Sequence, residues 1–130
     1  MPIDVRWDND DKVIIRHTYR GEWTLTDYVE ASDNTYNLID EVEHTVHLLI
    51  IVTEGVQPLS DMITAARDAR VIKHDRQGLQ VVVGASQFMI LITRIVRAVR
   101  PAARNVHFVN TINQAYAVIS NASASNGKSR

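Results

Sequence analysis

Residues 47–53 read HLLIIVT, and this uninterrupted aliphatic run decides the fold class of the chain. A second run of the same kind, LQVVVGA, occupies residues 79–85, and a shorter one, NVHFVN, occupies residues 105–110. Strands with one solvated face alternate polar and apolar residues, whereas parallel strands covered on both faces are continuously aliphatic. The three runs therefore predict buried parallel strands with helices on both sides of the sheet.

The segments around these runs have helical spacing. Between the runs lie residues 60–74 and 86–100, and the second of these stops before Pro101, as a helix should. The last helix is expected from Thr111 to residue 120, with Gln114 completing a capping box. Before the first run, residues 24–42 place an apolar stripe at helical spacing, with acidic residues on the opposite face. The members of the predicted stripe are Leu25, Tyr28, Val29, Ser32, Tyr36 and Ile39.

The chain begins with two alternating segments, residues 3–7 and 12–19, separated by the turn-forming sequence DNDD at 8–11. They predict a β-hairpin whose first strand runs antiparallel at the edge of the sheet. The predicted fold is therefore α/β, with the order β-β-α-β-α-β-α-β-α: a mixed, mostly parallel five-stranded sheet with an N-terminal antiparallel hairpin and four helices. Residues 1–120 form one domain, and residues 121–130 are expected to be a frayed polar tail.

Composition narrows the class of protein. The chain has 130 residues and no cysteine, so disulfides, zinc–thiolate sites and thiol nucleophiles are all excluded. No apolar run approaches the ~20 residues of a membrane span, and no signal peptide is evident, so we expect a soluble cytoplasmic protein. The net charge is −1, yet residues 1–61 hold 13 acidic and 4 basic residues whereas residues 62–130 hold 2 acidic and 10 basic.

In a parallel sheet the carboxyl ends of the strands meet at one edge, and ligands bind preferentially there. A candidate binding edge therefore consists of Thr53, Glu54, Gly84, Ser86, Asn110 and Thr111. Ser86 follows Gly84 at a strand-to-helix corner of the kind that can hold an anion, although a capped crossover is the favoured interpretation.

Basic residues recur at helical spacing, and with Asp61 they form a candidate docking surface: Arg94, Arg97, Arg100 and Arg104. An acidic partner, such as the acidic first helix of another copy, would suit it, and a merely solvated face is the alternative. Nucleic acid is not expected, because the isoelectric point is about 6.5 and only 6% of residues are aromatic. The five histidines lack the spacing of metal ligands, so neither metal nor cofactor is expected.

The hairpin, the following helix, the stretch HLLIIVTEGVQPLSDMITAAR, the strand ending in VVVGAS and the final VHFVNTINQAYAVI resemble the STAS domain, the fold of anti-sigma-factor antagonists. That resemblance implies a protein-interaction switch, with a kinase phosphorylating a serine at the start of the helix after the central strand. Ser60 occupies the matching place, preceded by Leu59 where the family commonly has Asp. A plain helix cap, with Asp61 favouring the positive helix end, explains Ser60 without any switch and is the favoured interpretation.

The sequence therefore predicts a non-enzymatic regulatory interaction module whose partner is another protein or a second copy of the chain. Two alternatives remain. The surplus apolar residues 88–91 of the predicted helix favour a small apolar or lipid-like ligand, or else a homodimer interface without any switch. An enzyme is not expected, because no nucleophile–base motif, carboxylate pair or metal set is evident.

Overall fold

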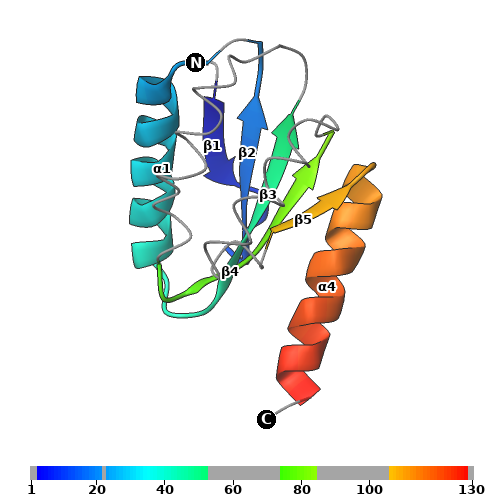
Figure 1. The fold of residues 1–130 in the computed structure, drawn as a ribbon. Helices are drawn as coiled ribbons and strands as arrows, with labels where there is room; N and C mark the ends of the chain where they lie inside the picture. Colours follow the sequence, from blue (N-terminus) through cyan, green and yellow to red (C-terminus); the bar gives the residue numbers. More distant parts are fainter. Residues whose placement is uncertain (1–2, 22, 53–73, 85–105, 129–130) are drawn as a thin grey trace, which may run out of the picture.

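The computed structural model describes residues 3–21, 23–52, 74–84 and 106–128 (Figure 1). These residues form one five-stranded sheet in the order β1-β2-β3-β4-β5, covered by helices α1 (Leu25–Asp40) and α4 (Ile112–Lys128). The strands are β1 (Ile3–Trp7), β2 (Ile14–Tyr19), β3 (Val46–Val52), β4 (Gln77–Val83) and β5 (Val106–Val109). Neighbouring strands from β2 to β5 are parallel, and β1 is antiparallel to β2. The predicted mixed sheet with an antiparallel first strand at its edge is confirmed.

The central strand β3 is buried on both faces, as its continuous aliphatic sequence predicts. Leu48 and Ile50 pack in the apolar clusters beneath α1, whereas Leu49 and Ile51 pack in the cluster beneath α4. Every residue from Val46 to Ile50 is buried. Because strand side chains point alternately to the two faces, a strand between two helical layers needs apolar residues at every position.

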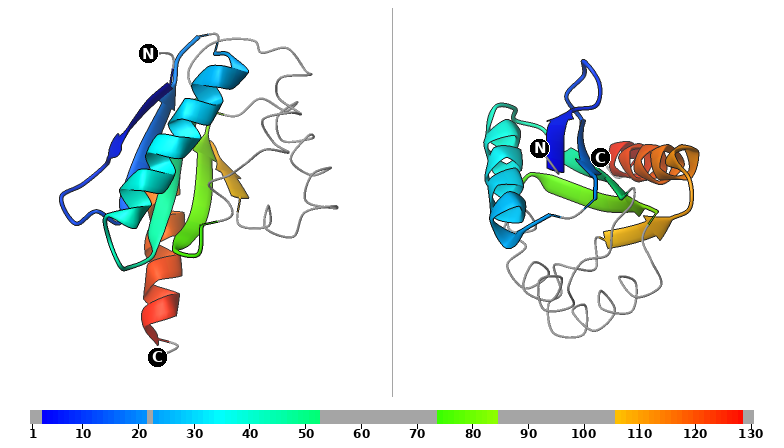
Figure 2. Two further views of the ribbon diagram at one scale, coloured as in Figure 1. Left: turned by 90° about the vertical axis from the view of Figure 1, so that its left-hand side faces the viewer. Right: turned by 90° about the horizontal axis from the view of Figure 1, so that it is seen from above.

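Helix α1 (Leu25–Asp40) lies across one face of the sheet, and α4 lies on the opposite face (Figure 2). The Thr24 hydroxyl accepts from the Asp27 backbone N–H, and the Asp27 carboxylate accepts from the Thr24 N–H, so the two residues form a capping box at the start of α1. The predicted apolar stripe of α1 is wrong in one respect. Tyr36 is 40% exposed, and the smaller residues Ala31 and Thr35 are buried instead.

Helix α4 spans Ile112–Lys128, eight residues beyond the predicted end of the last helix. The expectation of a frayed tail from residue 121 is wrong over residues 121–128, which are helical (Figure 1). Once a helix is nucleated, each further residue adds one hydrogen bond, so a polar sequence without proline continues it readily. The core contacts of α4 come from its first turns, where Ala115 and Ile119 are buried against β3 and β4.

A one-residue irregularity interrupts the pairing of β3 with β4. Val46 pairs with Gln77 and Leu48 with Gln80, so β4 carries one extra residue at this point. The His47 ring fills the irregularity, and its Nδ1 accepts a 2.9 Å hydrogen bond from the Leu79 backbone N–H. A Cβ at Gly78 would come within 2.5 Å of His47 Nδ1, so only glycine leaves room for this ring.

The helices predicted at 60–74 and 86–100 lie outside the described residues, except for His74, which precedes β4. Two of the four predicted helices are therefore described. No helix in the described ranges is long and apolar enough to cross a membrane.

Candidate functional site

The carboxyl ends of three neighbouring strands meet at one edge of the sheet, as expected for the candidate binding edge. Gly84 directly follows β4, and Asn110 directly follows β5, whose last residue pairs with Val83. Gly84 adopts φ +83°, and a Cβ on it would come within 2.6 Å of the Val52 carbonyl oxygen at the end of β3. A residue other than glycine would therefore force the ends of β3 and β4 apart.

The start of α4 uses its polar groups to stabilise the helix. The Gln114 backbone N–H donates to Thr111 Oγ1 at 3.1 Å. The Gln114 side-chain oxygen accepts from the backbone N–H groups of Asn110 and Thr111, at 2.9 and 3.3 Å. This is the predicted capping box, and it also explains Thr111 structurally. Because the Gln114 side chain accepts from the amides of Asn110 and Thr111, these two groups are not available to a ligand at the β5 end of the edge.

The other candidate residues lie outside the described residues: Thr53, Glu54, Ser60, Asp61, Ser86, Arg94, Arg97, Arg100 and Arg104. In sequence, the segment that holds Ser60 and Asp61 begins directly after Val52, the end of the central strand. The proposed phosphorylation site and basic docking surface therefore stay predictions.

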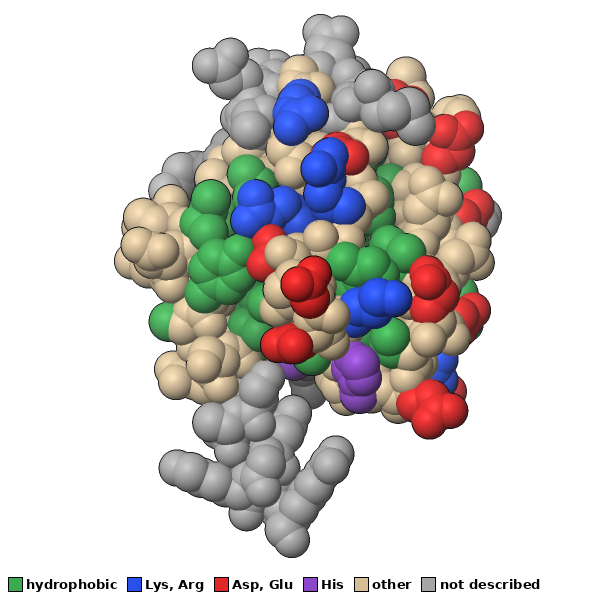
Figure 3. Space-filling model, turned by 180° about the vertical axis from the view of Figure 1, so that it is seen from behind, with side chains coloured by type: hydrophobic (Ala, Val, Ile, Leu, Met, Phe, Trp, Pro, Cys, Tyr) green, Lys and Arg blue, Asp and Glu red, His purple; other side chains and the backbone are tan. Residues whose placement is uncertain are grey.

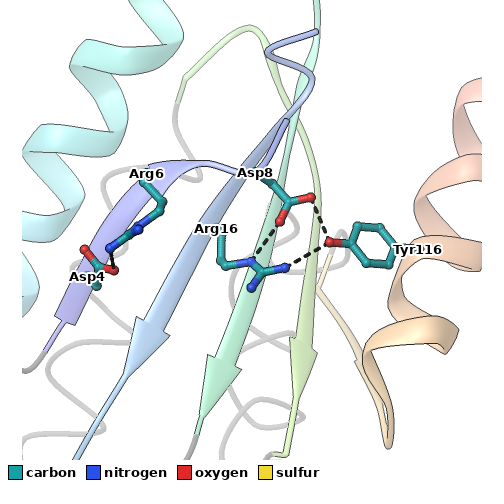
Figure 4. Close-up of polar contacts among 5 residues, drawn as sticks. All are labelled: Asp4, Arg6, Asp8, Arg16 and Tyr116. Atoms are coloured by element: carbon teal, nitrogen blue, oxygen red, sulfur yellow. Dashed lines mark hydrogen bonds and ion pairs between the residues drawn. The ribbon is translucent and has the colours of Figure 1, made fainter. Parts of the chain in front are cut away.

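A cluster of polar side chains that the sequence did not predict links β2, the hairpin turn and α4 (Figure 4). Arg16 Nε donates to Asp8 Oδ1 at 2.8 Å, and an Arg16 terminal nitrogen donates to the Tyr116 hydroxyl at 3.0 Å. The Tyr116 hydroxyl in turn donates to Asp8 Oδ2 at 2.8 Å. The three side chains thus form a closed ring of hydrogen bonds between residues up to 108 positions apart.

Two members of this ring, Arg16 and Tyr116, have shifted pKa values. The hydrogen bond with Tyr116 and the charge of Asp8 raise the pKa of Arg16, against the opposing effect of burial. Burial, followed by the hydrogen bond to Asp8, raises the pKa of Tyr116. The ring therefore keeps a charged guanidinium and a neutral phenol at physiological pH, which suits a structural clamp better than proton transfer.

The same face of the sheet is polar where it extends past α4 to β1. Asp4 and Arg6 of β1 lie on the face that carries Arg16, because Arg6 pairs with Arg16 and Asp4 with Thr18. Arg6 donates to the Asp4 carboxylate. Seen from behind, the molecule carries basic and acidic side chains next to one another, with hydrophobic side chains between them (Figure 3). This surface has mixed charge, unlike the single-sign surface typical of nucleic-acid binding.

His17 is the most deeply buried titratable group on the opposite face of the sheet. The Thr35 hydroxyl donates to the Ala31 carbonyl at 2.7 Å, so it must accept its 2.8 Å hydrogen bond from His17 Nε2. His17 Nδ1 is then unprotonated, and it is buried without a hydrogen-bond partner in the described structure. Burial lowers the pKa of His17 to about 4, so the ring is neutral at physiological pH.

Two further histidines are buried and hydrogen bonded. His47 supports the strand irregularity described above, and burial lowers its pKa. His74 Nε2 contacts Asp40 Oδ1 at 2.9 Å, and its Nδ1 accepts from the Arg76 backbone N–H at 3.1 Å. Within the described ranges, no three His, Cys, Asp or Glu side chains are grouped as metal ligands. His47 therefore connects β3 to β4, and His74 connects the end of α1 to the segment before β4.

The sequence alone did not predict the hydrogen bonds that join Asp8 and Arg16 to Tyr116. Asp8 was interpreted as part of a turn, and Tyr116 lies 100 residues from Arg16. A signal did exist for His17, since it alternates with Ile15 and Tyr19 on the buried side of β2. No protein-family profile matches the chain, and no curated protein sequence is significantly similar to it.

Proposed function

We propose that the protein is a non-enzymatic regulatory interaction module of STAS-like architecture, acting in the cytoplasm. Its partner would bind at the carboxyl edge of the sheet, next to the segment that follows β3. The observation that carries this proposal is the place of β3 in the sheet. It is the central strand of five, its two neighbours run parallel to it, and the segment with Ser60 follows its carboxyl end.

The roles of the described polar groups support binding rather than catalysis. The hydrogen-bonding groups of one polar cluster bond to each other, in Asp8, Arg16 and Tyr116. The start of α4 is capped by Thr111 and Gln114. A general acid or base needs a pKa near the working pH and access to substrate. His17 has neither, because burial holds it neutral and closes it off from solvent.

Gly84 supports the choice of edge. Its left-handed backbone and close approach to the Val52 carbonyl hold the ends of β3 and β4 together. A rigid pair of strand ends is a suitable platform for a loop that a partner recognises, since binding residues are commonly carried on loops of a rigid scaffold. A phosphate on Ser60 would add roughly two negative charges to the segment that follows β3 and so change its affinity for a partner.

The proposal is tested by purifying tagged protein from its own cells and measuring its intact mass, with Ser60→Ala and Ser60→Asp prepared in parallel. We expect a phosphate on the wild type that is lost in Ser60→Ala, and a partner whose affinity differs between the Ala and Asp variants. Ser86→Ala, at the second predicted helix start, is the matched control. An unphosphorylated Ser60, together with a partner that binds all variants equally, would rule out the switch.

A partner recovered in this way should cross-link to the segment after β3. Cross-links confined to other surfaces would contradict the choice of edge while leaving the module itself intact. The alternative of a small apolar ligand rests on residues 88–91, which lie outside the described residues. Native mass spectrometry of freshly purified protein distinguishes it, because a bound small molecule adds a fixed mass to the chain.

A further inference from the structure

The outer edge of β1 pairs with no strand in the described part of the chain, and the β1–β2 ladder defines which of its backbone groups point outward. The Asp8 backbone N–H donates to the Ile14 carbonyl at 2.8 Å, which extends the β1–β2 ladder by one pair. Opposite residues in an antiparallel ladder alternate between hydrogen-bonded and non-bonded pairs. Asp4 and Arg6 therefore bond to β2, and the N–H and C=O groups of Ile3, Val5 and Trp7 point away from it.

No strand in the described part of the chain lies beyond β1. Such an edge is a template for pairing with another strand, and proteins usually block it or use it. We propose that β1 pairs with β1 of a second copy around a two-fold axis at Val5, so that the two five-stranded sheets join into one continuous sheet.

The side chains of β1 are self-complementary in this register. A two-fold axis at Val5 places Asp4 of each copy opposite Arg6 of the other copy, so two such pairs form on the polar face of the sheet. It places Ile3 opposite Trp7 on the face that packs toward α1. Asp4 and Arg6 form non-bonded pairs across the new interface, where opposite side chains come closest. The outward backbone groups of Ile3, Val5 and Trp7 all receive partners.

The charges of Asp4 and Arg6 also disfavour the two neighbouring registers of the β1–β1 pair. Only registers that pair odd-numbered residues can use the outward backbone groups of β1. An axis at Asp4 would place the two Asp4 carboxylates opposite each other, and an axis at Arg6 would do the same with two guanidinium groups. Like charges directly opposite are destabilising, so among these three registers the charges of Asp4 and Arg6 favour the axis at Val5.

Arg6 is free to change partner on association. Its side chain is 66% exposed, and its contact with Asp4 within the same strand is an exposed ion pair of little energetic consequence. Because a five-residue strand pair is a small interface, we expect a dissociation constant of roughly 1–100 µM. The proposal goes beyond the proposed function and does not depend on it, because neither Ser60 nor the carboxyl edge takes part.

The test uses charge reversal on β1, with mass measured by light scattering and native mass spectrometry across that concentration range. Asp4→Arg places Arg opposite Arg6 and Arg6→Asp places Asp opposite Asp4, so each single variant should dimerise at least about 10-fold more weakly. An equimolar mixture of the two single variants should form heterodimers, because every cross-strand pair is again of opposite charge. The double variant D4R/R6D should regain the homodimer.

Rescue by mixing is an outcome that misfolding of a variant would not produce. Glu30→Arg, on the outer surface of α1, makes the same charge change as Asp4→Arg and should dimerise like the wild type. In the wild type, the amides of Val5 and Trp7 should exchange hydrogen more slowly as concentration rises. A wild type that stays monomeric throughout the range, or single variants that dimerise as well as the wild type, would overturn the proposal.

Discussion

His17 places an ionisable ring where its charged form is unfavourable. It is 4% exposed, its ring lies 6.4 Å from that of Tyr19, and its one hydrogen-bonded nitrogen donates to Thr35. A hydroxyl that already donates to a backbone carbonyl fixes the tautomer of the histidine that bonds to it. The consequence is a group that the folded protein keeps neutral over most of the pH range in which free histidine titrates.

This arrangement predicts a loss of stability in mild acid. The folded pKa of His17 is about 4 and the ordinary value is 6.5, so between these pH values the unfolded chain binds the extra proton. The stabilisation is complete above pH 6.5 and falls as the pH decreases toward 4, by about 3 kcal/mol in all. Urea unfolding at pH 7.5, 6.0 and 4.5 measures it. His17→Gln keeps an N–H donor without titrating, so the free energy of unfolding of this variant should depend less steeply on pH. The same pH dependence in the variant and the wild type would show that His17 is not the group responsible.

Gly84 and Gly21 form a natural pair for separating backbone strain from steric contact. Both have positive φ, +83° and +61°, but a Cβ on Gly21 meets nothing within 4 Å. Gly21→Ala should therefore cost only the left-handed conformation, about 1 kcal/mol. Gly84→Ala adds a contact with the Val52 carbonyl and should cost about 3 kcal/mol or more, measured by urea unfolding. Equal losses for the two variants would show that the β3 and β4 ends separate easily.

At the scale of elements, α4 is attached to the sheet by two different kinds of contact. Ala115 and Ile119 bury apolar surface against β3 and β4, whereas Tyr116 reaches across to Arg16 and Asp8. Apolar burial is not directional, but hydrogen bonds require defined geometry, so the ring of three side chains fixes how α4 lies relative to the hairpin.

Removal of the Tyr116 hydroxyl should show how much this ring contributes. Tyr116→Phe leaves one oxygen of the nearly buried Asp8 carboxylate and one Arg16 N–H without their protein partner. We expect a loss of about 1–2 kcal/mol in the free energy of unfolding. Tyr36→Phe, on the exposed surface of α1, is the control and should change stability by less than about 0.5 kcal/mol. If Tyr116→Phe no longer changes stability once Asp8→Asn is also present, the two groups act as one unit.

At the scale of the whole molecule, the two helical layers share one sheet. Each strand from β2 to β4 contributes side chains to clusters on both faces, so loss of packing on one face should be transmitted to the other. Small domains built in this way usually unfold in one cooperative transition.

This cooperativity can be measured with one substitution in each layer. Ile39→Ala beneath α1 and Ile119→Ala beneath α4 should each cost about 2–4 kcal/mol, because both side chains are buried. Both tryptophans, Trp7 and Trp23, pack on the α1 side. If the domain is one unit, Ile119→Ala should shift the tryptophan fluorescence transition as far as the circular dichroism transition. Separate transitions would mean that the layers unfold independently.

The sequence by itself determined the mixed, mostly parallel sheet and, apart from the end of α4, the boundaries of the described elements to within a few residues. The continuous aliphatic runs predicted β3 and β4, the alternating segments predicted the hairpin, and Thr24 and Thr111 marked the helix starts. These signals are local, because periodicity and capping depend on residues a few positions apart. The end of α4 was missed because no glycine or proline marks it near residue 120.

Only the tertiary structure decided which distant side chains meet. It joined Asp8 and Arg16 to Tyr116, placed His17 against Thr35, fitted the His47 ring over Gly78, and exposed Tyr36 while burying Thr35. Such contacts depend on strand register and on how a helix is rotated over the sheet, and a one-residue change in either exchanges the side chains that face each other. The candidate binding edge followed from the parallel order of the strands, but the close packing of Gly84 on β3 that makes it rigid did not.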